Sequence, residues 1–225
     1  MANTHKKIKT FLMVGKRGSG KSYQIKKLLS DLSVKSNRFL ISPTAKLDKT
    51  FNNCFLDHQV FTTYTDDLID MILNIIKEER KEIAFNFHYK WDEEEEDYVI
   101  IKSRVGKQPK YPSYLLVLDD IIGTAATKAR SAVSNLFCNH RHFCLHVIIA
   151  SQNYKSIPPI IRNNSIIYYI WETNNKEAKK IEEEHNIYKT EREFLDLLEN
   201  KTSKPYQALI IDYLKPKNKR YSSNF

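Results

Sequence analysis

Cysteine is scarce in this chain, and long apolar runs are missing from its sequence. Three cysteines among 225 residues, with no CxxC pair, argue against a disulfide framework and favour a reducing compartment. No apolar stretch approaches the roughly 20 residues that a membrane-spanning helix needs. Residues 1–9 are polar and basic, without the apolar centre of a secretory signal. We therefore expect a soluble intracellular protein without a membrane-spanning segment.

Glycine is also scarce, and its distribution is uneven. The chain has five glycines, and three of them, Gly15, Gly18 and Gly20, lie close together. They belong to residues 15–22, G-K-R-G-S-G-K-S, which match the phosphate-binding pattern G-x-x-x-x-G-K-[ST] without gaps. An apolar strand pattern over 8–14 precedes the motif and a helical pattern over 22–32 follows it. This context predicts a P-loop nucleoside triphosphatase and disfavours a chance glycine-rich turn.

Short apolar runs alternate with helical patterns along the rest of the chain. The candidate strands are residues 38–41, 60–63, 114–118, 145–150, 165–171 and 206–212. The candidate helices are residues 66–80, 128–141, 175–185 and 190–200. Continuous apolar runs are typical of parallel strands buried on both faces. The alternation predicts a single α/β domain over 1–214, with three α/β/α layers and a mainly parallel central sheet.

Two segments carry no motif that this fold explains. Residues 84–112 are expected to form an exposed excursion, with a hairpin around 98–103. The excursion holds an acidic run over 92–97, expected to be a solvated loop, and a basic segment over 102–110. Residues 215–225 are expected to form a basic C-terminal tail. Both basic segments suit contact with DNA phosphates, but solubility explains them equally well.

The phosphate loop predicts where a nucleotide binds. The expected nucleotide-binding residues are Gly15, Lys16, Arg17, Gly18, Ser19, Gly20, Lys21 and Ser22. Backbone N–H groups of such a loop wrap phosphates, and the N-terminus of the following helix favours negative charge. Lys21 is expected to reach the β- and γ-phosphates, and Ser22 to ligate Mg²⁺. The expected cofactors are therefore ATP and Mg²⁺.

Polar side chains end two of the apolar strands. Asp119 suits Mg²⁺ coordination, and Asp120 beside it can orient or deprotonate the attacking water. A polar strand end or a helix cap is the alternative for this pair. Gln152 would lie beside the γ-phosphate if its strand lies between the two strands that carry the motifs. The alternative for Gln152 is a solvent-facing residue that leaves the sheet.

Arg141 and Arg162 are candidate arginine fingers. A finger supplied by a neighbouring subunit stabilises the charge of the transition state in trans. The alternative for each residue is an ordinary surface arginine.

Four motifs stand in one order along the chain: residues 15–22, residues 115–120, Arg141-His142 and Ser151-Gln152. Together they resemble the FtsK/HerA superfamily of DNA-pumping ATPases, and most of all the poxvirus-type virion DNA-packaging ATPases of large DNA viruses and virophages. In that family an Asp-Asp pair closes the Walker B strand and an Arg-His pair leads into a strand ending in Gln. A Pro-rich turn with an Arg-Asn pair follows, as residues 158–163 do here. The resemblance covers residues 8–171.

The resemblance implies a RecA/FtsK-like sheet with an additional strand and a homo-oligomeric ring, hexameric or pentameric. Such a ring threads double-stranded DNA, independently of sequence, into a preformed capsid, beside a capsid or portal-vertex protein. The resemblance makes Arg141 the preferred finger, with Arg162 second. It places the protein in the virus factory of the host cytoplasm and in the virion. The net charge of +9 and pI of about 9.3 fit a polyanionic partner, although solubility explains this charge equally well.

Two other functions stay open from the sequence. A small P-loop kinase would phosphorylate a nucleotide or another metabolite, although the Asp119-Asp120 pair and Gln152 fit it poorly. A nucleotide-regulated scaffold would hydrolyse ATP very slowly. A zinc site is disfavoured, because Cys138, His140, His142 and Cys144 lack the paired spacing of structural zinc sites. Buried cysteines at a helix-to-strand junction explain this segment better.

Overall fold

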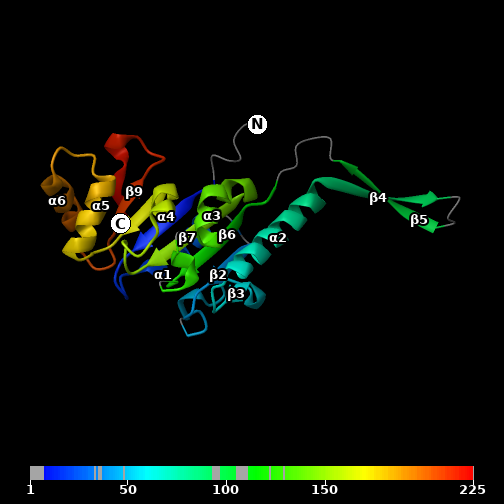
Figure 1. Ribbon diagram of the computed structural model, residues 1–225, viewed down its shortest axis with the longest axis horizontal. Helices are drawn as coiled ribbons and strands as arrows, with labels where there is room; N and C mark the ends of the chain where they lie inside the picture. The colour runs from blue at the N-terminus through cyan, green and yellow to red at the C-terminus, as the bar shows by residue number, and fades with distance from the viewer. Residues whose placement is uncertain are drawn as a thin grey trace.

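The computed structural model describes most of the chain, namely residues 8–32, 34, 37–47, 49–92, 97–104, 111–121, 123–128 and 130–224. Most of the acidic run, residues 93–96, and much of the basic segment, residues 105–110, lie outside these ranges. The described residues form an eight-stranded sheet with helices on both faces and a separate two-stranded sheet (Figure 1).

The elements alternate along the chain much as the apolar pattern indicates. The strands are β1 (Thr10–Val14), β2 (Arg38–Ile41), β3 (Val60–Phe61), β4 (Phe85–Asp92), β5 (Asp97–Arg104), β6 (Tyr114–Asp119), β7 (Leu145–Ser151), β8 (Ile167–Ile170), β9 (Leu209–Asp212) and β10 (Tyr221–Ser223). The helices are α1 (Lys21–Asp31), α2 (Asp66–Ile83), α3 (Ala132–Asn139), α4 (Pro159–Asn164), α5 (Asn175–His185) and α6 (Glu191–Thr202), with a short 3-10 helix η5 (His140–Phe143) before β7.

The large sheet has the strand order β10-β9-β8-β1-β7-β6-β2-β3. The strands from β8 to β3 run parallel to their neighbours, whereas β9 is antiparallel to β8 and β10 is antiparallel to β9. The prediction of a mainly parallel α/β sheet is therefore confirmed. Strand β7 lies between β1 and β6, the two strands that carry the nucleotide motifs. This is the additional strand that the resemblance implied.

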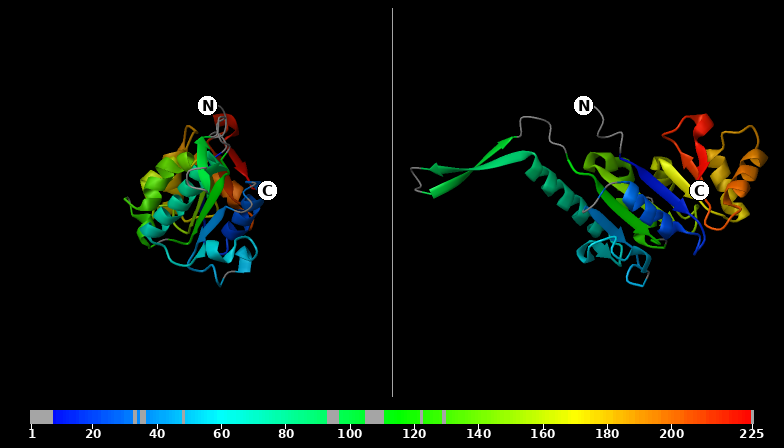
Figure 2. Two further views of the ribbon diagram at one scale, coloured as in Figure 1. Left: turned by 90° about the vertical axis from the view of Figure 1, so that its right-hand side faces the viewer. Right: turned by 180° about the vertical axis from the view of Figure 1, so that it is seen from behind.

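Helices cover the two faces of the sheet unequally. Helices α2 to α6 contribute apolar side chains to a core on one face, and α1 packs against the other face (Figures 1 and 2). Helix α2 is an example of this packing. Its residues Ile69, Ile72 and Ile76 recur at helical spacing and are fully buried, so this apolar stripe faces the sheet. The Thr65 hydroxyl caps the helix by accepting a hydrogen bond from the Leu68 N–H at 3.1 Å. In the described part of the chain, every helix is too short or too polar to cross a lipid bilayer.

Local structure differs from expectation at several places. Helix α3 begins later than the expected 128, at Ala132, because the Ser131 hydroxyl accepts from the Ser134 N–H at 3.1 Å and caps it there. Cys138 is exposed, so the expectation that the cysteines of this junction are buried holds only for Cys144. Residues 221–223, expected in a tail, pair with β9 as the edge strand β10.

The excursion contains a longer hairpin than residues 98–103. Strands β4 and β5 pair only with each other among the described strands, from Phe85 opposite Arg104 to Asp92 opposite Asp97. They extend away from the large sheet beyond the end of α2 (Figures 1 and 2).

His146 and His185 are two of the three buried histidines in the described part of the chain, the third being His140. His146 on β7 accepts a hydrogen bond from the Lys9 N–H through Nδ1 at 3.1 Å. His185 on α5 lies between the hydroxyls of Tyr154 and Tyr213, each 2.7 Å from one ring nitrogen. Burial, which disfavours the charged ring, lowers the pKa of each histidine from 6.5 to about 4. Between these two pKa values the two imidazoles are therefore protonated in the unfolded chain but neutral in the folded protein.

We expect the free energy of unfolding to fall as the pH falls from about 6.5 towards 4. In this window the unfolded chain binds protons at His146 and His185 that the native state does not bind, so acid favours unfolding. Urea unfolding followed by circular dichroism at several pH values measures the slope. His146→Gln should reduce the slope, because one of the two histidines with a pKa lowered to about 4 is then absent. An unchanged slope in His146→Gln would contradict this assignment.

Candidate active site

The phosphate loop joins the end of β1 to the start of α1. The Gly15 N–H donates to the Ser151 carbonyl at 3.2 Å, which fixes the loop to the end of β7. A Cβ atom at Gly15 would lie 2.6 Å from the Ser19 Oγ and 2.8 Å from the Trp171 Cβ, so only glycine fits. Gly20 precedes α1 with a φ of +103°, which residues with a side chain rarely adopt. These contacts open the N-terminus of α1 towards a phosphate group.

Lys21 is the first residue of α1, and its side chain folds back over the loop. Its Nζ donates to the carbonyls of Gly15 at 2.6 Å and Lys16 at 2.9 Å. Burial lowers the pKa of the Lys21 ammonium, and the negative charges of Asp119 and Asp120 oppose that shift. The ammonium is thus placed between the loop and the two carboxylates, where a bound phosphate chain would meet it.

Asp119 ends β6 and faces the phosphate loop from across β7. Its side chain is buried, with a residue exposure of 6%, and the Ser42 hydroxyl donates to Oδ2 at 3.4 Å. Asp119 and Ser22 line the same cavity. A carboxylate and a hydroxyl are oxygen donors of the kind that Mg²⁺ prefers, so this pair fits the ion.

Asp120 follows β6 in a left-handed backbone conformation, with a φ of 53°. This conformation is uncommon outside glycine, and aspartate is among the residues that tolerate it. The Gln152 Nε2 donates to the Asp120 Oδ1 at 3.1 Å. Because β7 lies between β1 and β6, Gln152 meets the condition on which its expected role depends. The acid and the amide therefore lie together at the carboxyl edge of the sheet.

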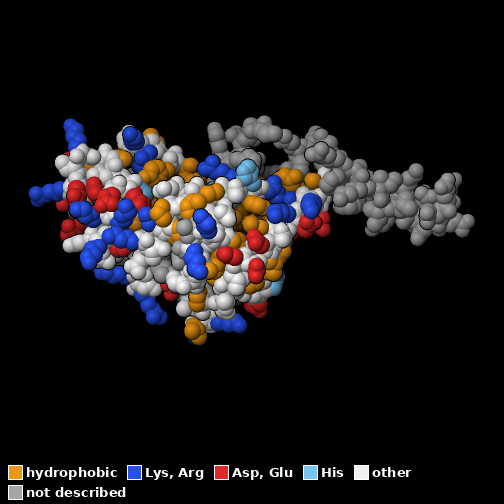
Figure 3. Space-filling model, viewed as in Figure 1, with side chains coloured by type: hydrophobic (Ala, Val, Ile, Leu, Met, Phe, Trp, Pro, Cys, Tyr) orange, Lys and Arg blue, Asp and Glu red, His pale blue; other side chains and the backbone are white. Residues whose placement is uncertain are grey.

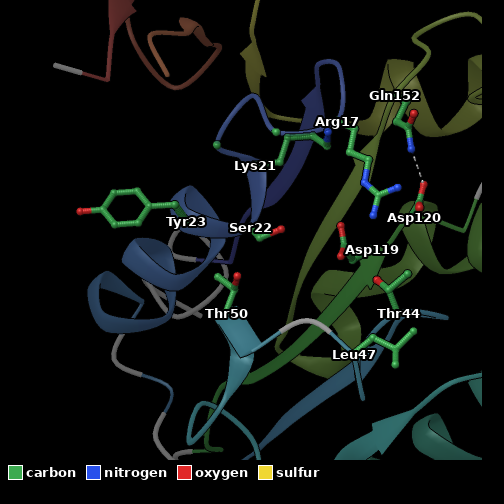
Figure 4. Close-up of a pocket in the computed structure, with 12 residues that line it drawn as sticks. Arg17, Lys21, Ser22, Tyr23, Thr44, Leu47, Thr50, Asp119, Asp120 and Gln152 are labelled. Atoms are coloured by element: carbon green, nitrogen blue, oxygen red, sulfur yellow. Dashed lines mark hydrogen bonds between the residues drawn. The ribbon is translucent and has the colours of Figure 1, made fainter. Parts of the chain in front are cut away.

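These side chains surround one cavity of about 690 Å³ (Figure 4). Figure 4 shows Arg17 reaching over the cavity towards Asp119, whereas the Tyr23 ring points away from it. Three further residues line the cavity from the segment after β2 and were not predicted from the sequence, namely Thr44, Leu47 and Thr50. The sequence contains a signal for this segment: Ser42-Pro43-Thr44 follows the end of β2, just as Gln152 follows the end of β7. Polar residues after a strand end could therefore have been predicted to line the site.

Arg141 lies far from its own phosphate loop. It is exposed on η5, which precedes β7 and so lies at the amino end of that strand. The phosphate loop lies at the opposite, carboxyl edge of the parallel strands. Arg141 thus cannot serve the ATP site of its own chain, and its role as a finger in a neighbouring site stays a prediction.

Arg162 is held inside its own chain. Its exposure is 6%, and its guanidinium donates to the Glu184 carboxylate at 3.0 and 2.8 Å and to the Ile157 carbonyl at 2.7 Å. Removing one partner of such a buried pair costs about 3–5 kcal/mol. A role in trans would require the loss of these contacts, so the geometry favours Arg141 over Arg162.

The parallel sheet, the phosphate loop and the acids across an inserted strand define a P-loop ATPase. The family model described as "Poxvirus A32 protein" matches residues 3–221. The chain therefore belongs to the poxvirus A32 protein family, which confirms the resemblance to virion DNA-packaging ATPases. A search of curated proteins finds no match to this chain.

Solved structures share the fold. The DNA-packaging ATPase B204 from Sulfolobus turreted icosahedral virus matches with a TM-score of 0.62 and 16% identity, over 96% of each chain. The genome packaging NTPase B204 from Sulfolobus turreted icosahedral virus 2, in complex with AMPPCP, matches with a TM-score of 0.60 and 18% identity, over 96% of this chain and 97% of that chain. The cytoplasmic domain of the Type VII secretion ATPase EccC from Thermomonospora curvata matches with a TM-score of 0.55 and 13% identity, over 99% of this chain and 24% of that chain.

We expect Asp120→Asn to lower kcat for ATP hydrolysis on the order of 100-fold, the low end of what one positioned acid or base supplies. Asparagine keeps the shape of the side chain and tolerates the left-handed backbone, so folding and ATP affinity should change little. Steady-state kinetics and ATP titration measure both quantities. Asp57→Asn, at an exposed aspartate outside the cavity, is the matched control. Full activity in Asp120→Asn would remove this residue from catalysis.

Proposed function

We propose that this protein hydrolyses ATP to drive double-stranded viral DNA into a preformed capsid. The observation that carries the proposal is the meeting of Lys21, Asp119, Asp120 and Gln152 around one cavity, from three neighbouring strand ends. Membership of the poxvirus A32 protein family supports packaging as the use of this ATPase.

Each side chain of the cavity has a part in hydrolysis. The loop N–H groups and Lys21 bind the β- and γ-phosphates and neutralise their charge. Asp120 orients the attacking water and accepts its proton, because its carboxylate faces the cavity from the end of β6. Gln152 holds the Asp120 carboxylate through the 3.1 Å hydrogen bond, and its amide lies where it can contact the γ-phosphate or the water.

Ser22 and Asp119 are the residues that would hold Mg²⁺. The ion, when bound, supplies positive charge beside the transferred phosphoryl group. The burial of Asp119 and its bond from Ser42 keep that carboxylate directed at the cavity.

A ring of identical chains, hexameric or pentameric, would complete the site. Arg141, exposed at the opposite sheet edge from the phosphate loop, is free to enter the cavity of a neighbouring chain. There its guanidinium would stabilise the charge of the transition state.

Double-stranded DNA is the proposed polymer, bound through its phosphates and independently of sequence. The net charge of +9 supports this. On the face shown in Figure 3, however, basic side chains over α5 and α6 lie among acidic ones, and several are paired, such as Lys180 with Glu183 at 3.0 Å. This face is therefore not the proposed path of the DNA. A capsid or portal-vertex protein is the proposed docking partner, in the virus factory of the host cytoplasm and in the virion.

The family match does not favour the small kinase or the nucleotide-regulated scaffold. The Asp120–Gln152 pair also argues against a kinase, because two groups placed to position water suit hydrolysis rather than transfer to another acceptor.

We expect ATP turnover to rise when double-stranded DNA of arbitrary sequence is added. Lys21→Ala should lower turnover on the order of 100-fold or more, because a positioned cation is lost from the transition state. Phosphate release with and without DNA measures this. Lys26→Ala, at an exposed lysine of the same helix, should keep the wild-type rate. Turnover that ignores DNA would contradict a DNA motor.

We also expect inactive variants to complement each other. Arg141→Ala removes the finger but keeps the phosphate loop, whereas Lys21→Ala does the reverse. In a mixture, the intact loop of one chain meets the intact finger of its neighbour, so part of the activity should return. Each variant alone is the control, with circular dichroism to show that both are folded. A mixture as inactive as its components would exclude Arg141 as a trans finger.

A further inference from the structure

A second cleft lies on the other side of the phosphate loop from the acids. Its volume is about 400 Å³, and it is bounded by residues 16–19, by Trp171 and Glu172 after β8, and by residues 202–207 before β9. Arg17 and Gly18 line both this cleft and the active-site cavity, so the two hollows adjoin across the loop. The proposed catalytic roles of Asp119, Asp120 and Gln152 make no use of this cleft.

The order of the strands determines which end of a bound nucleotide faces which side of the phosphate loop. Strands β7 and β8 flank β1 on opposite sides, and Gln152 and the two acids lie on the β7 side. The γ-phosphate must face these groups for hydrolysis to occur. The nucleoside at the other end of the triphosphate therefore leaves the loop away from the acids, on the β8 side, where the second cleft opens. A volume of about 400 Å³ is ample for a nucleoside.

Tyr206 presents an aromatic ring beside the phosphate loop. It is 62% exposed, and its backbone has a φ of 65°. Two donors hold this unusual conformation: the Trp171 Nε1 and the Asn224 Nδ2 each donate to the Tyr206 carbonyl at 3.1 Å. A Cβ atom at Gly20 would lie 3.3 Å from the Tyr206 ring, which places the ring against the loop. Exposed aromatic rings fixed in this way are suited to stack on a nucleobase.

The cleft also holds an unsatisfied acceptor. Gln207 lines it, and the Gln207 Oε1 is buried without a hydrogen-bond partner among the described residues. A buried polar atom without a partner is uncommon in folded proteins, and a rotation of the Gln207 amide would present it to a ligand donor in the cleft. The exocyclic amine of adenine is such a donor, whereas hypoxanthine carries an oxygen at that position.

We propose that this cleft is the nucleobase subsite of the ATP site, in which Tyr206 stacks on adenine and Gln207 accepts from its amine. The proposal rests on the proposed function for the placement of the phosphates. It makes the segment before β9 a determinant of which nucleotide powers the protein.

Paired ligands test the subsite. Tyr206→Gly removes the ring but suits the positive φ, so folding should be kept, and Tyr206→Phe keeps the ring. Calorimetric titration of each variant with ATP and with inorganic tripolyphosphate separates the base from the phosphates. We expect Tyr206→Gly to weaken ATP binding about tenfold, within the range of one lost stacking contact, and to leave tripolyphosphate binding unchanged. Tyr206→Phe should bind both ligands as the wild type does.

Competition between ATP and inosine triphosphate tests Gln207. The wild type should prefer ATP, and Gln207→Leu should lose most of that preference, because the acceptor for the amine is gone. An unchanged preference would overturn the role of Gln207.

Two results would overturn the subsite as a whole. One is wild-type ATP affinity in Tyr206→Gly. The other is that Tyr23→Ala loses ATP affinity whereas Tyr206→Gly does not, which would place the base against α1 instead. Failure of the motor would look different: ATP would still bind more tightly than tripolyphosphate through Tyr206, but DNA would not change turnover.

Discussion

The parallel pairing of β7 between β1 and β6 is the constraint on which the ATP site depends. Because of this pairing, the Ser151 carbonyl accepts from the Gly15 N–H and holds the phosphate loop at the sheet edge. The same strand separates the loop from the carboxylates of β6 by one strand width, which leaves room for phosphates between them. Gln152, the first residue after β7, then lies between the two halves of the site.

Three groups of residues with different proposed roles lie at separate places around the sheet. Hydrolytic groups gather on the β7 side of the phosphate loop, and the cleft with Tyr206 opens on the β8 side. Arg141 lies at the amino edge, out of reach of its own loop. The candidate hydrolytic groups, the proposed base cleft and Arg141 thus lie at three separate places around one sheet, so a substitution in one place need not disturb the others.

Local patterns explain why much of this could be predicted from the sequence. The phosphate loop and Asp119 each follow an apolar strand, and parallel strands bring their carboxyl ends together. Contacts between distant segments leave no such pattern. The ion pair of Arg162 with Glu184 joins different helices, β10 is too short and polar to be told from a tail, and Tyr206 gains its place from Trp171 and Asn224. These three features could not be predicted from the sequence, because each depends on contacts between different segments of the chain.

The central position of β1 has a consequence for biosynthesis. Both of its neighbours come from the second half of the chain, since Thr10 pairs with Val147 and Phe11 with Ile167. During translation this apolar strand is synthesised before both of its partners, so neither of its edges is paired until they follow. Such non-local pairing slows folding and exposes an aggregation-prone segment meanwhile. The phosphate loop after β1 can therefore reach its native position only after β7 and β8 have been synthesised, because the Gly15 N–H is bonded to the end of β7.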